Sequence, residues 1–80
     1  MNAPLLTQDD LADAREETHR LLQSAMHYCK LTQGHLAIAD DAGAIWDFHH
    51  ADEYFKGAVR QFEIVRAAFS QRVIKPEQGA

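Results

Sequence analysis

The chain has 80 residues and a mass of 9.0 kDa, enough for one small domain over residues 1–80. Hydrophobic residues make up 46% and charged residues 25%, proportions that exclude an intrinsically disordered chain. The formal net charge of −4 disfavours direct binding to nucleic acid. Cys29 is the only cysteine, so an intrachain disulfide is excluded, and we expect a reducing, cytoplasmic location.

The N-terminus carries no signal peptide in this interpretation. The first residues lack the basic start and apolar core of a signal peptide, and no apolar run approaches the roughly 18 residues of a membrane span. We therefore expect no membrane partner, and we expect residues 1–6 and 76–80 to be mobile ends.

The first predicted element is a helix over residues 7–33. Thr7 suits the N-cap, and Asp10 is placed three residues later to complete a capping box. Gly34 is the expected stop. Small and apolar residues recur at spacings of three and four and predict one buried face: Leu11, Ala14, Thr18, Leu21, Leu22, Ala25, Cys29 and Thr32.

Residues 35–47 are ambiguous. Leu36 and Ile38 alternate before the Asp40–Gly43 turn sequence, which predicts a short β-hairpin. The alanine content of the same stretch favours an extension of both helices towards Gly43. Both interpretations remain open at this stage.

The second predicted helix covers residues 48–75. All four phenylalanines, Phe48, Phe55, Phe62 and Phe69, lie seven residues apart. Small or branched residues follow them at three or four positions, as in a helix–helix interface that packs large side chains against small ones. Because the residue before a proline avoids the helical conformation, we expect the helix to end at Lys75.

A second contact face is predicted on the side of this helix opposite the phenylalanines. Ile64 lies there together with Gly57 and Ala68, and Trp46 joins them if its segment is helical. Small residues allow another backbone to approach closely, so these four residues complete the predicted interface set.

These elements predict a mainly α fold, an antiparallel helical hairpin with the phenylalanine row packed on the first helix. Two helices cover each apolar face from one side only, so the rings would stay partly exposed. We therefore expect a homodimer in which two hairpins form a four-helix bundle.

Catalytic and metal chemistry receive little support from the sequence. Cys29 falls on the predicted apolar face, where a free cysteine is a small core residue. Glu16 and His19, and likewise Asp47 and His50, have the spacing of a di-metal bundle, but Glu16 and His50 lie opposite the predicted apolar faces. We expect no enzyme activity, no cofactor and no metal ligand.

The expected function is a small protein–protein interaction module, an adaptor, chaperone or regulator that binds a protein partner through its helical surface. One alternative is a metal-binding helical protein with a site assembled across a dimer. Another is an acidic regulator that binds a nucleic-acid-binding protein without touching the nucleic acid itself.

Overall fold

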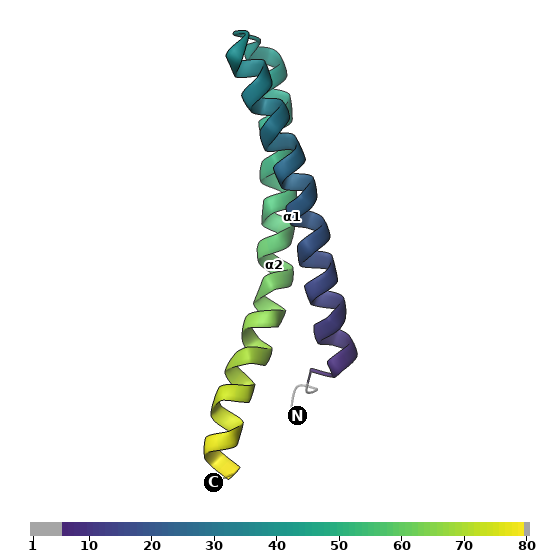
Figure 1. Cartoon of the computed structure of the whole chain (residues 1–80), viewed down its shortest axis with the longest axis vertical. Coiled ribbons are helices and arrows are strands. Elements are labelled where there is room, and N and C mark those ends of the chain that lie inside the picture. Colours follow the sequence, from purple (N-terminus) through teal and green to yellow (C-terminus); the bar gives the residue numbers. More distant parts are fainter. Residues whose placement is uncertain (1–5, 80) are drawn as a thin grey trace.

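The chain folds into two antiparallel helices (Figure 1). The computed structural model describes residues 6–79, and describes side chains as far as Gln71. Helix α1 spans Gln8–Ala37 and α2 spans Asp41–Gly79. The molecule is a rod of 60 × 25 × 18 Å with a radius of gyration of 17.9 Å, against about 12 Å for a compact domain of this length. The predicted helical hairpin is confirmed.

The start of α1 is the predicted capping box. The Thr7 hydroxyl accepts a hydrogen bond from the Asp10 amide at 3.0 Å, and the Asp10 carboxylate accepts one from the Thr7 amide at 3.0 Å. Hydrogen bonding of the Asp10 carboxylate to the Thr7 amide, and secondarily to the Thr7 hydroxyl, lowers the pKa of Asp10. Two of the free amides of the first turn are thereby satisfied.

The predicted end of the first helix at residue 33 is wrong, because α1 continues through Gly34 to Ala37. The stop is a Schellman motif in which the Asp40 amide donates to the His35 carbonyl at 2.8 Å. The Ala39 amide donates to the Leu36 carbonyl at 3.1 Å, and Ala39 has a left-handed φ of 58°. The turn between the helices is therefore only three residues long.

Of the two interpretations left open for residues 35–47, the helical extension is confirmed and the β-hairpin is wrong, since no strand occurs in the part of the chain that the structure describes. The aspartates that suggested a strand turn instead begin a helix. The Asp40 carboxylate accepts a hydrogen bond from the Gly43 amide at 3.1 Å, which caps the start of α2. Helix α2 thus begins at Asp41 and not at residue 48.

The predicted end of the second helix at Lys75 is wrong as well, because α2 extends to Gly79. The fixed φ of a proline suits a helix, and Pro76 removes one backbone donor near the helix end. The predicted mobile ends include residues 1–5 and 80, which lie outside the described residues. The mobility of residues 6 and 76–79 stays a prediction.

The two helices pack through a seam of buried and half-buried residues, mostly small, that recur at alternating spacings of three and four. On α1 the seam consists of Leu11, Ala14, Thr18, Leu21, Ala25, Tyr28, Thr32 and His35. On α2 it consists of Ala44, Asp47, Ala51, Tyr54, Ala58, Gln61, Val65 and Ala68. No large side chain in the described residues is completely buried.

The prediction that the phenylalanine row packs between the helices is wrong. The side chains of Phe48, Phe55, Phe62 and Phe69 are 62%, 54%, 45% and 66% exposed. The seam on α2 instead combines the position before each phenylalanine with the position four residues before it, where Ala44, Ala51 and Ala58 let the two backbones approach closely. A Cβ atom added to Gly57 would lie only 3.3 Å from a methyl carbon of Leu21, which shows how closely the two helices approach at this point.

The two buried threonines of the seam are compatible with an apolar interface because their hydroxyls are satisfied within α1. Thr18 donates to the Ala14 carbonyl at 2.7 Å, and Thr32 donates to the Tyr28 carbonyl at 2.7 Å. Their methyl groups then pack in the seam without an unsatisfied polar atom beside them.

Candidate interaction surface

The largest feature of the surface is an apolar strip along one side of the hairpin. It comes from both helices, in the heptad position that follows the seam: Leu22, Cys29 and Leu36 on α1, and Phe48, Phe55, Phe62 and Phe69 on α2. Met26, Ile45 and Val59 widen it at its edges, with exposures of 65%, 72% and 46%. We call these ten residues the apolar flank.

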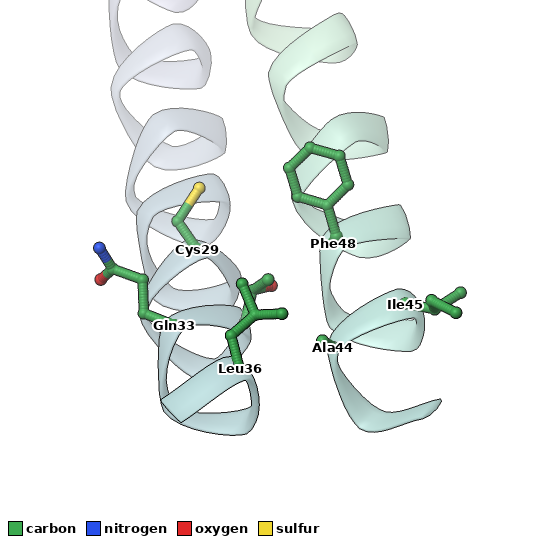
Figure 2. A pocket seen from close by; sticks show the side chains of 7 residues that line it. Cys29, Gln33, Leu36, Ala44, Ile45 and Phe48 are labelled. Atoms are coloured by element: carbon green, nitrogen blue, oxygen red, sulfur yellow. The ribbon is translucent and has the colours of Figure 1, made fainter. Parts of the chain in front are cut away.

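A groove opens into the apolar flank beside the turn (Figure 2). It has a volume of about 580 Å³. Figure 2 shows Cys29, Gln33 and Leu36 from α1 and, across from them, Ala44, Ile45 and Phe48 from α2. Thr32 also lines the groove. The small seam residues form its floor and the larger flank residues its walls.

A second groove of about 260 Å³ lies further towards the open end of the hairpin. Leu22 of α1 and Phe55, Val59 and Phe62 of α2 line it over a floor of Thr18 and Ala58, with Glu63 and Arg66 at its edge. The Arg66 guanidinium lies 5.7 Å from the centre of the Phe62 ring. The apolar flank is therefore continuous along both halves of the rod and is hollowed in each.

The opposite side of the hairpin is polar. Its hollow of about 470 Å³ is lined by Glu17, Leu21, His50, Glu53, Tyr54, Gly57, Arg60 and Gln61. We call its charged and aromatic members, Glu17, His50, Glu53, Tyr54 and Arg60, the polar flank.

The polar flank is internally bonded. Tyr28 of the seam stacks on His50 and on Tyr54, with ring centres 5.0 and 5.6 Å apart. The His50 ring also bonds to the Trp46 carbonyl at 2.9 Å. Glu17 pairs with Arg20, and this guanidinium lowers the pKa of the glutamate while the glutamate raises the pKa of the arginine. These groups already have partners within the hairpin.

The turn holds the one charged cluster that joins the helices among residues 6–71. His35 Nε2 lies 2.9 Å from the buried carboxylate of Asp47, and His35 Nδ1 lies 2.8 Å from Asp40. The contact between Nδ1 and Asp40 is short enough for an ion pair, but its geometry is not that of a hydrogen bond. This cluster fixes the turn end of the rod.

The predicted interface residues separate into three groups. The four phenylalanines lie on the apolar flank, as described above. Gly57 and Ala68 are buried in the hairpin itself, so the predicted free face of Gly57, Ile64 and Ala68 is wrong. Ile64 is half-buried, and Trp46 is 66% exposed with its ring 4.7 Å from that of His50. The predicted four-residue face is therefore not free, because two of its members are buried in the hairpin.

The prediction that Cys29 is a core residue is also wrong, because its side chain is exposed and lines the groove beside the turn. The sequence interpretation missed the part that α1 plays in the apolar flank. The signal was available, since Leu22, Cys29 and Leu36 repeat every seven residues as the phenylalanines do. Two parallel heptad rows on an antiparallel hairpin mark one side of it.

Two further observations limit the chemistry of the surface. Among the side chains that the structure describes, no three His, Cys, Asp or Glu residues are grouped to hold a metal ion. Neither helix, over its described residues, contains a segment long and apolar enough to cross a membrane.

Comparisons with protein-family models, with curated proteins and with solved structures found no match to this chain.

Proposed function

We propose that the chain is a non-enzymatic protein–protein interaction module of the adaptor, chaperone or regulator type, with the apolar flank as its working surface. The observation that supports this most strongly is the row of four phenylalanines, each about half exposed on a folded hairpin. Such rings leave roughly 3–6 kcal/mol of favourable burial unused. An exposed apolar strip of this length is typical of an interaction site.

The form of interaction that we propose is the homodimer in which two hairpins make a four-helix bundle. A second copy offers a matching heptad row, and covering the flank on both copies would remove the exposed rings from water. A different partner chain with an apolar helical face is the competing occupant.

The absence of catalysis in this proposal is supported by the groove beside the turn. The polar side chains that line it are a thiol, a hydroxyl and an amide, from Cys29, Thr32 and Gln33. Nucleophilic catalysis needs a general base within reach of the nucleophile, and no acidic, basic or histidine side chain lines this groove among its described residues.

The test compares matched variants of the two flanks by light scattering. We expect the wild type at about twice the chain mass of 9.0 kDa. The Phe55→Ser/Phe62→Ser variant is expected at the mass of one chain with its helicity retained. The control, Glu53→Ser/Arg60→Ser on the polar flank, is expected to stay dimeric.

Two results would contradict the proposal. Equal masses for the two variants would show that the apolar flank is not the working surface. A wild type that stays at the mass of one chain at millimolar concentration would exclude the homodimer and favour a different partner chain.

A further inference from the structure

We infer that a second copy docks on the apolar flank in antiparallel orientation, with a two-fold axis that crosses α2 beside Val59. This inference rests on the proposed function and adds the geometry of the complex. The turn of each hairpin then lies at the open end of the other.

The exposed area indicates an occupant as large as the hairpin itself. The chain exposes 6398 Å², whereas a compact monomer of 9 kDa exposes about 4,900 Å². The excess of about 1,500 Å² per chain corresponds to about 3,000 Å² for a pair, which lies in the range of permanent homodimers. A short peptide in one groove would leave most of this surface uncovered.

The spacing of the phenylalanines fixes the register. Phe55 and Phe62 flank Val59 along α2, and Phe48 and Phe69 lie one heptad further out on either side. An antiparallel crossing beside Val59 places Phe55 over Phe62 of the second copy and Phe48 over its Phe69. Every ring of the row gains an aromatic neighbour in this register, and a shift by one heptad leaves one ring of each copy without one.

The charges beside the row distinguish antiparallel from parallel packing. Asp52 and Arg66 occupy the same row as Val59, seven residues before and after it. In the antiparallel dimer Asp52 of each copy faces Arg66 of the other.

Parallel packing would instead lay α1 over α2 of the second copy, at the same level along the rod. Arg15 lies one turn beyond Thr18, which lines the same groove as Arg66, so Arg15 would meet Arg66 of the second copy. Repulsion between like charges at the edge of an interface disfavours that orientation by more free energy than a pair of opposite charges at the same place would contribute to binding. Among the side chains of residues 6–71, the ion-pair partners of Asp52 and Arg66 are both intrahelical, Lys56 at 2.9 Å and Glu63 at 3.6 Å.

The first experiment is cross-linking of a cysteine placed at the axis. Val59→Cys in a Cys29→Ser background is expected to form a disulfide-linked dimer rapidly under a mild oxidant. Both positions are exposed, so the substitutions leave the hairpin intact. Ile45→Cys in the same background is the control, because antiparallel packing holds its two copies at opposite halves of the bundle.

The second experiment is a charge exchange followed by sedimentation. Asp52→Arg and Arg66→Asp are each expected to weaken dimerisation about tenfold, and the double variant is expected to recover most of the loss. Two results would overturn the antiparallel register while leaving the proposed function in place. One is a dimer in which Val59→Cys forms the disulfide no faster than Ile45→Cys. The other is a double variant that dimerises as weakly as the single variants. Failure of the proposed function is a different result, namely equal behaviour of the Phe55→Ser/Phe62→Ser variant and the wild type.

Discussion

The two flanks of the hairpin lie on the same seam and differ in what their side chains contact. On the polar flank several of the charged and aromatic groups have partners within the chain, namely Arg20 for Glu17, Lys56 for Glu53 and Tyr28 for His50. On the apolar flank the large side chains of Leu36 and Phe48 form the walls of an open groove. The difference shows that the seam holds the hairpin together, whereas the large side chains of the apolar flank stay exposed.

The largest expected effect is that the loss of stability caused by a substitution on the apolar flank depends on protein concentration. Phe62→Ala should cost only about 1 kcal/mol in the free hairpin, because the ring is 45% exposed. In the dimer it should approach the cost of a buried ring, about 3–5 kcal/mol. Urea unfolding at micromolar and at millimolar concentration measures both. Arg60→Ala on the polar flank is the control, and an equal effect of Phe62→Ala at both concentrations would remove the distinction between the flanks.

The next effect acts on the seam that supports both flanks. Ala58 is 2% exposed, so Ala58→Leu should force the helices apart at a cost of about 1–3 kcal/mol. Thermal unfolding measures it. Ala67→Leu, at an exposed position of the same helix, should be nearly neutral. An equally tolerated leucine at both positions would show that the seam is not closely packed.

A smaller effect compares two glycines within the helices. A Cβ atom at Gly34 would meet nothing within 4 Å, so Gly34→Ala should stabilise the hairpin by about 1 kcal/mol through helix propensity. At Gly57 the new methyl group would press against Leu21, so Gly57→Ala should gain less. Chemical denaturation of both variants gives the order, and a larger gain at Gly57 would contradict the close contact across the seam.

The smallest expected effect is a dependence of stability on pH at the start of α1. Because the pKa of Asp10 is lowered in the folded chain, its contribution to stability is present above its ordinary pKa of 3.8 and is lost as the pH falls through the lowered value. Asp10→Asn should therefore lower the melting temperature near neutral pH, and the difference from the wild type should vanish in strong acid. Asp13→Asn removes a nearby charge outside the capping box as the control. A difference that persists unchanged in strong acid would contradict the capping role.

The sequence was sufficient to predict the hairpin and the capping box. It misassigned which row of the repeat faces the other helix. Any two residues seven apart lie on the same side of a helix, so a seven-residue spacing does not say which side faces the other helix. The row of Ala51 and Ala58 and the row of Phe55 and Phe62 both have this spacing, and either could pack against α1. Large rings gain more by burial, but small residues permit a closer approach of backbones, and hydrophobicity alone does not decide between these effects.

The turn was missed for a related reason. Asp40 and Gly43 suit both a strand turn and a helix cap, and the choice depends on contacts with His35 and Asp47, which lie on different helices. Ala39 gives no sequence signal for its left-handed conformation, which normally favours glycine. The conformation of this segment therefore depends on side-chain contacts that form only when the two helices pack together.

The placement of both outer helix ends at one end of the rod restricts how two copies can be joined into a single polypeptide. In the antiparallel dimer that we infer, Gly79 of one copy lies about 30 Å beyond the axis, and Gln8 of the other copy lies about 17 Å beyond it in the opposite direction, at a rise of 1.5 Å per helical residue. Since an extended residue spans at most about 3.5 Å, a tether between them needs at least about 13 residues. A tandem gene with a shorter tether would prevent its two halves from pairing with each other, and each half would recruit a hairpin from another molecule.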